Sequence, residues 1–92
     1  EYPLRPDTRM TTGSICDRPT EYRYADKFPP RGMAYCERDV STSTKDYIYR
    51  EYRSLGYRLN PGSRSSYKID HFFPLCAGGS NNDDNLWPQH VS

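Results

Sequence analysis

The sequence has little of the aliphatic content that usually builds a hydrophobic core. Only 34% of its 92 residues are hydrophobic, and nine of these are tyrosines; valine, isoleucine, leucine, phenylalanine, methionine and tryptophan together are scarce. A chain of this length buries only about 60–65% of the surface that its unfolded form exposes. We therefore expect one small α+β domain over residues 1–92 that needs a covalent staple or a partner segment for stability.

The chain also lacks a long apolar run, a signal peptide and an overall excess of positive charge. Without a long apolar run no membrane-spanning segment is expected, and an exported protein of this sequence would be in its mature form. The net charge of +1 does not by itself indicate a nucleic-acid partner. Ten of the thirteen cations are arginines, whose guanidinium groups suit phosphate contacts. On composition alone, a solvated, salt-bridged surface is the simpler interpretation.

No Cys-x-x-Cys pair is present, which disfavours a structural zinc site. Cys16, Cys36 and Cys76 are far apart in a loop-rich chain, a pattern typical of disulfide-stapled proteins of the secreted or periplasmic space. Residues 1–40 are rich in proline and are predicted to be irregular. A Cys16–Cys36 bridge would tie this segment down, closing a loop of roughly 20 residues and contributing ~3 kcal/mol. The odd count leaves one thiol without an internal partner.

An amphipathic helix is predicted over residues 43–56. Ile48, Tyr52 and Leu55 recur at i, i+4 and i+7 and form an apolar stripe. The serine and threonine residues just before the stripe offer helix caps. Gly56 is a natural stop, because glycine readily adopts the left-handed conformation that ends many helices.

A hairpin is predicted in the C-terminal part of the chain, residues 66–92. Residues 66–70 alternate polar and apolar side chains, as a strand does. Residues 77–84 are rich in glycine, asparagine and aspartate and are expected to form a loop. Residues 85–87 are predicted to be a short return strand. Pro88 and the residues after it are expected to begin a helix.

The adjacent pair Asp70-His71, followed fourteen residues later by Asn85, is the most informative pattern. A carboxylate can hold a hard cation, and an imidazole can take up a proton near neutral pH. A side-chain hydrogen bond from Asn85 would fix the loop that carries His71. Taken alone, the Asp-His pair is better explained as a surface ion pair. Together the three residues indicate metal-assisted hydrolysis.

Four short runs along residues 67–90 give this pattern a specific context: Asp70-His71, Pro74-Leu75, Gly78-Gly79-Ser80-Asn81 and Asn85-Leu86-Trp87-Pro88-Gln89. They resemble the first two-thirds of the ββα-metal motif of HNH endonucleases, in which a β-hairpin and a helix grip one divalent ion. Three upstream runs resemble, more loosely, small secreted bacterial HNH nucleases: Tyr2-Pro3, Thr12-Gly13-Ser14-Ile15-Cys16 and Tyr35-Cys36-Glu37-Arg38.

The resemblance implies a small ββα-metal (His-Me finger) domain that hydrolyses phosphodiester bonds of DNA, and of RNA as a second candidate substrate, with low sequence specificity. Asp70 is expected to be a metal ligand, His71 the general base and Asn85 the structural asparagine. The implied metal is most simply Mg²⁺, with Mn²⁺, Zn²⁺ or Ni²⁺ as alternatives. Arg64 and Lys68 lie nearest the motif and are the expected phosphate contacts.

The family's last metal ligand lies on a helix that would fall beyond Ser92. We therefore expect a C-terminal segment or a second chain to complete the motif, or His90 to substitute as ligand. The resemblance also implies that Cys16 pairs with Cys36, and that Cys76 pairs with a cysteine beyond the end of the chain.

Two other classes of function stay open at this stage. The first is a module on the same ββα scaffold that binds nucleic acid or a protein without catalysis. The second is a disulfide-stapled structural zinc domain, which would depend on the cysteines rather than on Asp70.

Overall fold

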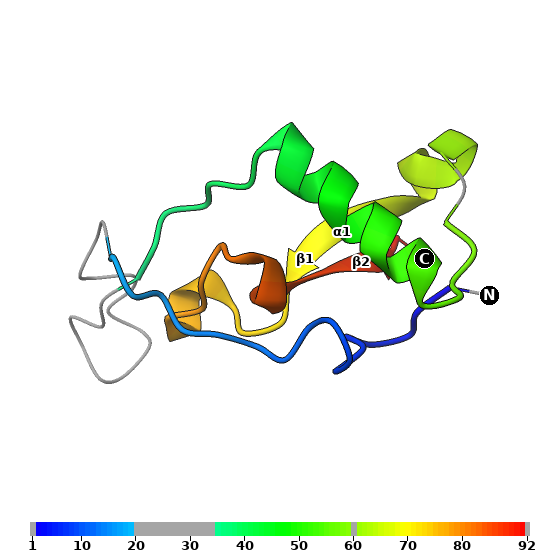
Figure 1. Ribbon diagram of the computed structural model, residues 1–92. Helices are drawn as coiled ribbons and strands as arrows, with labels where there is room; N and C mark the ends of the chain where they lie inside the picture. Colours follow the sequence, from blue (N-terminus) through cyan, green and yellow to red (C-terminus); the bar gives the residue numbers. More distant parts are fainter. Residues whose placement is uncertain (1, 20–34, 60, 92) are drawn as a thin grey trace.

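The computed structural model describes residues 2–19, 35–59 and 61–91, with the side chains of 61–63 excepted, and has an α+β architecture (Figure 1). Its regular elements are α1 (Thr42–Ser54), β1 (Tyr67–His71), β2 (Leu86–His90) and the 3-10 helices η1 (Pro61–Ser66), η2 (Leu75–Ala77) and η3 (Asp83–Asn85). None of the helices within these described ranges is long and apolar enough to span a bilayer.

The predicted helix is present as α1, displaced by one or two residues at each end. Ser41 is its N-cap, and the Ser41 side chain accepts a hydrogen bond of 3.2 Å from the backbone N–H of Thr44. Such a bond satisfies one of the donors that the first turn leaves without a helical partner. Gly56 follows the C-cap with a φ of 108°, a left-handed conformation that ends the helix at low cost only for glycine.

The two predicted strands form an antiparallel hairpin, β1 with β2. The register places Asp70 opposite Trp87 and Tyr67 opposite His90. β1 begins and ends one residue later than predicted, so that His71 is its last residue. Asp70 and His71 therefore lie where β1 ends and the connecting loop begins.

The helix expected to begin at Pro88 is not formed, and that prediction was wrong. Pro88 lies in the middle of β2, fully buried and opposite Ile69. A sheet of two strands consists of edge strands only, where the missing N–H of proline is tolerated. The pairing with β1 therefore extends the second strand through residue 90 instead of ending it at residue 87.

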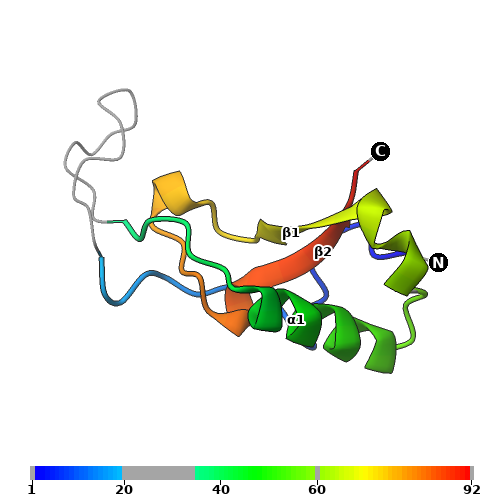
Figure 2. The same cartoon turned by 90° about the horizontal axis from the view of Figure 1, so that it is seen from above.

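The core lies between α1 and the hairpin, which α1 crosses on one side (Figures 1 and 2). Its buried side chains come from α1, the segment after it and β2: Ile48, Tyr49, Tyr52, Leu59, Leu86 and Trp87. Two of these six are tyrosines, so part of the apolar area that the chain lacks in aliphatic residues is supplied by aromatic rings. Leu55, predicted to be part of the apolar stripe, is only half-buried.

The N-terminal segment has no helix, and no strand beyond isolated bridge residues at Ile15 and Tyr35, in the parts of residues 1–40 that are described, as predicted. It runs along the β2 side of the hairpin (Figure 1) and is held by a buried hydroxyl network. The Thr11 hydroxyl donates to the backbone oxygen of Leu86 at 2.8 Å and lies 2.6 Å from the Tyr52 hydroxyl. The backbone N–H of Asp7 donates to the same Tyr52 oxygen at 2.9 Å. Tyr52 thus joins α1, β2 and the N-terminal segment.

Asp7 carries a second set of contacts in the same segment. The Arg9 guanidinium donates to both carboxylate oxygens of Asp7, at 3.0 and 2.6 Å, and the Tyr57 hydroxyl donates at 2.7 Å. The hydrogen bonds from Arg9, above all, hold the pKa of Asp7 well below its usual range, although burial opposes them. Since the folded-state pKa is lowered, ionised Asp7 stabilises the fold above the unfolded-state pKa of about 4.

Asp7→Asn is therefore expected to lower the urea midpoint at neutral pH, and the difference from the wild type should shrink as the pH falls below about 4, where Asp7 loses its charge in the unfolded chain. Urea denaturation at several pH values, followed through the fluorescence of the single tryptophan, measures both midpoints. A difference that stays constant down to the acid limit would show that ionisation of Asp7 contributes nothing to stability.

Candidate active site

The Asp-His pair lies at the point where β1 ends. His71 is buried, with 8% of its surface exposed, and pairs across the hairpin with Leu86. Asp70 is half-buried, and its Oδ1 accepts a hydrogen bond of 2.9 Å from the backbone N–H of His71. This contact uses one carboxylate oxygen and fixes the carboxylate beside the first residue of the loop.

The loop after His71 folds back on itself, and its two glycines permit this. Gly78 has a φ of 85°, in the left-handed region. At Gly79 the constraint is space, because a Cβ atom would lie 1.7 Å from the backbone oxygen of Phe73. The Gly78-Gly79 pair therefore lets the chain pass directly over the residues that follow the Asp-His pair.

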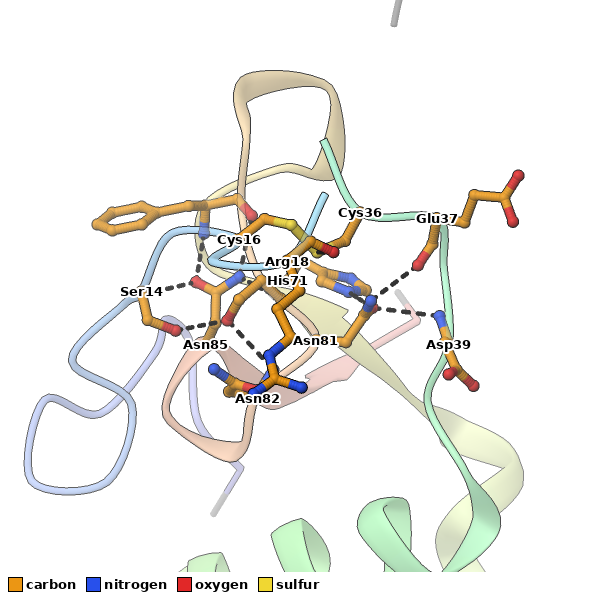
Figure 3. Close-up of a disulfide and its surroundings, with 12 residues drawn as sticks. Ser14, Cys16, Arg18, Cys36, Glu37, Asp39, His71, Asn81, Asn82 and Asn85 are labelled. Carbon is orange, nitrogen blue, oxygen red and sulfur yellow. Dashed lines mark hydrogen bonds between the residues drawn. A yellow bond between two sulfur atoms is a disulfide. The ribbon is translucent and has the colours of Figure 1, made fainter. Parts of the chain in front are cut away.

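Asn85 connects the two ends of this loop through a fully buried side-chain amide. Its Oδ1 accepts from the backbone N–H of Phe73 at 2.9 Å, and its Nδ2 donates to the backbone oxygens of Phe73 at 3.1 Å and Ser80 at 2.8 Å (Figure 3). The backbone N–H of Ser14 adds a longer contact of 3.4 Å to Asn85 Oδ1. Through these bonds Asn85 fixes the conformation of the segment that carries His71.

A second asparagine, Asn81, contacts the imidazole directly. Asn81 Oδ1 lies 2.9 Å from His71 Nε2. The same oxygen accepts from the backbone N–H of Asp39 at 3.2 Å, and Asn81 Nδ2 donates to the backbone oxygen of Glu37 at 2.8 Å. Figure 3 shows the Asn81 side chain between the His71 ring and the segment of Glu37 and Asp39.

These contacts determine which nitrogen of His71 carries the proton in the neutral ring. The Asp39 N–H can only donate and the Glu37 carbonyl can only accept, so the amide of Asn81 has one acceptable orientation, with Oδ1 toward Asp39. Oδ1 is an acceptor, and Nε2 of His71 must therefore be the donor. The lone pair of the neutral imidazole is then on Nδ1, which has no hydrogen-bond partner among the described residues.

The disulfide connects the segment that contacts the glycine turn with the segment that holds Asn81. Cys16 and Cys36 are bonded, which confirms the predicted pair, with their Cα atoms 5.8 Å apart. The backbone N–H of Cys16 donates to the oxygen of Gly78 at 2.8 Å, so one end of the bridge contacts the glycine turn. The other end leads directly into residues 37–39, which hold Asn81. The bridge thus ties the loop to the segment that orients the imidazole.

The two residues predicted to contact phosphate are Arg64, which pairs with a residue of α1, and Lys68, which belongs to β1. Arg64 forms an ion pair with Asp46 and stacks over the ring of Tyr49 at 4.5 Å, so its guanidinium is already engaged within the protein. Lys68 is exposed on β1. The two expected phosphate contacts thus differ, because only Lys68 has its charged group available to a ligand.

The structure does not bring His90 to the Asp-His pair. His90 ends β2 and stacks on the Tyr2 ring, with 4.3 Å between ring centroids. It lies opposite Tyr67, three residue pairs from Asp70 and so roughly 10 Å along the strands. Cys76, in η2, is half-buried and forms no disulfide with a described residue.

The carboxylate directly beside His71 is that of Asp70. No cluster of three or more His, Cys, Asp or Glu side chains placed to hold a metal occurs among residues 2–19, 35–59 and 61–91. Mg²⁺ is commonly held by one or two carboxylates together with substrate phosphates and water, so Asp70 alone fits a weak, substrate-dependent site. It does not fit a structural zinc site, which needs four protein ligands.

The contact between Asn81 and His71 was not predicted from the sequence. The sequence places Asn81 at the end of the Gly78-Gly79-Ser80-Asn81 run, which gives no indication of this contact. The two backbone partners that orient Asn81, Glu37 and Asp39, lie more than forty residues earlier in the chain, and no local pattern connects them to it.

Comparisons with protein-family models, with curated protein sequences and with solved structures found no match to this chain.

Asn85→Ala is expected to lower the free energy of unfolding by about 2–4 kcal/mol, because it leaves two backbone groups of Phe73 and the backbone oxygen of the buried Ser80 without their partner. Urea denaturation with Trp87 fluorescence measures the loss. Asn82→Ala, an exposed neighbour whose side chain makes no hydrogen bond to the described residues, is the matched control and should stay within about 0.5 kcal/mol of the wild type. Equal stability of the two variants would contradict the role given to Asn85.

Proposed function

We propose that this protein is a metal-dependent endonuclease that hydrolyses phosphodiester bonds of DNA, and of RNA as a second candidate substrate, with low sequence specificity. The observation that carries the proposal is the imidazole of His71, held through Nε2 by an asparagine of fixed orientation next to the Asp70 carboxylate. The sequence resemblance to the ββα-metal motif supports the same assignment, and the proposed family is that of the HNH endonucleases.

In this mechanism His71 is the general base. Its Nδ1 lone pair takes a proton from a water molecule, and the oxygen of that water attacks the phosphorus atom. The bond to the 3′ oxygen breaks and this oxygen takes a proton from a second water molecule, which leaves a 5′-phosphate and a 3′-hydroxyl. Asn81 keeps Nε2 protonated and holds the ring in place, so that the orientation is set before substrate binds. Asn85 fixes the loop on which these groups depend.

Asp70 is the proposed ligand for a divalent cation, most simply Mg²⁺. When bound, such a cation supplies electrostatic stabilisation of the charge that builds on the phosphate and on the leaving oxygen. The carboxylate suits this task because its position is fixed by the backbone N–H of His71, while its second oxygen forms no hydrogen bond to a described residue.

A binding module without catalysis is the second candidate. It is favoured by one observation: the described residues include no group of three or more His, Cys, Asp or Glu side chains placed to hold a metal. A non-catalytic module would bind nucleic acid through the same surface but would not need His71. The two candidates are separated by the activity of variants at this residue.

His71→Ala is expected to lower the rate of plasmid nicking in Mg²⁺ by about a hundred- to ten-thousandfold, the usual contribution of a positioned general base. The assay follows conversion of supercoiled to open-circular plasmid. His90→Ala, the same substitution at the far end of the hairpin, is the control and should retain activity. Because His71 is buried, circular dichroism and the urea midpoint verify that each variant is folded. Unchanged nicking by His71→Ala, or by the wild type in excess EDTA, would sink the mechanism.

Asn81→Ala is expected to lower kcat by about ten- to a hundredfold with little change in KM, because it frees the imidazole without removing it. Asn81→Asp keeps an acceptor for Nε2 and should recover part of the loss. Steady-state cleavage of a labelled duplex separates kcat from KM. Equal losses in both variants, in proportion to lost stability, would assign Asn81 a purely structural role.

A further inference from the structure

A cavity of about 330 Å³ lies beside the candidate active site, between the first turns of α1, the segment before it and β1. Three cationic side chains line it, one from each of these parts: Arg38, Lys45 and Lys68. Tyr49 and Tyr67 contribute aromatic walls, and none of the described residues that line the cavity is acidic. We call Arg38, Lys45 and Lys68 the cationic cradle.

The charges of the cradle are not neutralised by the described parts of the protein. All three side chains are exposed, and none of them forms an ion pair with a described carboxylate. The acidic residue adjacent to Lys45 in the sequence is engaged elsewhere. Asp46, which follows Lys45, pairs with Arg64. Arg64 itself lies over the ring of Tyr49 and so supports the cavity wall rather than adding a free charge.

The cradle is next to the Asp-His pair by two routes. Along β1, Lys68 and Asp70 are two residues apart and therefore point to the same face of the hairpin, roughly 6.5 Å from each other. This spacing is comparable to one nucleotide step along a nucleic-acid backbone. The second route passes through Arg38.

Arg38 also lines a second cavity, of about 310 Å³, together with Arg18 and with Asn81, the residue that holds His71. The flanking acids Glu37 and Asp39 line this second cavity and not the cradle. Arg38 and Arg18 thus carry positive charge from the cradle to the cavity beside Asn81. The acidic residues Glu37 and Asp39 also line that cavity, close to His71.

We propose that the cationic cradle binds a backbone phosphate of the nucleic-acid strand, next to the phosphate that reacts at Asp70 and His71. The inference rests on the proposed function and specifies where the strand runs: over the free side of β1 and the start of α1. Three cations around one cavity, from parts of the chain that only the fold brings together, suit the negatively charged phosphates of a nucleic-acid backbone. The contact is to the backbone and carries no sequence information.

The test is equilibrium binding in EDTA, where no cleavage occurs. Fluorescence anisotropy of a short labelled DNA duplex is measured over a range of salt concentrations for the wild type, Lys45→Gln and Lys68→Gln. Arg50→Gln is the matched control, since it removes the same charge from an exposed position of α1 that points roughly 140° away from Lys45 around the helix axis. Each variant is compared with the wild type by its urea midpoint, which should not change because these side chains are exposed.

Lys45→Gln and Lys68→Gln should each weaken binding about three- to tenfold, and each should reduce the slope of log K against log salt by about 0.7–0.9. Arg50→Gln should change neither quantity beyond the small effect of net charge. Losses in the two lysine variants no larger than in Arg50→Gln would overturn the cradle.

Failure of the cradle and failure of the nuclease proposal give different results. If the lysine variants lose affinity but the wild type never nicks plasmid, the cradle stands and the proposed function fails. If nicking depends on His71 while the lysine variants bind like the wild type, the function stands and the cradle fails.

Discussion

The buried amide of Asn85 is the contact on which the candidate site depends. It satisfies backbone groups of Phe73 and Ser80, two residues that belong to opposite ends of the loop between the strands. Without such a partner the backbone oxygen of the buried Ser80 would be unpaired, at a cost of about 1–3 kcal/mol, and the two part-buried groups of Phe73 would lose their partner as well. With it, the loop has one conformation, and the Asp-His pair at its start is presented in a fixed geometry. The close passage of Gly79 over Phe73 is part of the same constraint.

Polar contacts of this kind have a large share in the whole fold, because the chain has few aliphatic residues to bury. The Tyr52 ring belongs to the core, while its hydroxyl lies within hydrogen-bond distance of Thr11 and accepts from the backbone of Asp7. A single side chain thus contributes both apolar area and a connection between segments more than forty residues apart. The disulfide adds a covalent connection of the same type between the irregular segments on either side of it. Buried and fully paired networks of this sort favour one arrangement over others.

The candidate base and the cationic cradle are linked through one short segment, residues 36–39. Cys36 anchors it, the backbone of Glu37 and Asp39 holds Asn81, and Arg38 is one of the three cations of the cradle. The same stretch would therefore orient the imidazole and contact the strand to be cut. In the proposed function this segment couples the position of the substrate strand to the orientation of His71. The contact of Arg38 with the strand and the contacts of Glu37 and Asp39 with Asn81 depend on the same short backbone.

The sequence by itself determined the helix, the hairpin and the irregular N-terminal segment, because caps, apolar periodicity, alternation and proline act over a few residues. It also indicated Asp70, His71 and Asn85 as a group and the Cys16–Cys36 pair. It misjudged Pro88, whose local preference is overridden by pairing across the hairpin. Only the tertiary structure decided that Asn81 holds His71, that Arg64 is engaged by Asp46, and that Arg38, Lys45 and Lys68 surround one cavity. Each of these contacts joins residues ten or more positions apart or from separate elements, and such separations leave no periodic or local signal in the sequence.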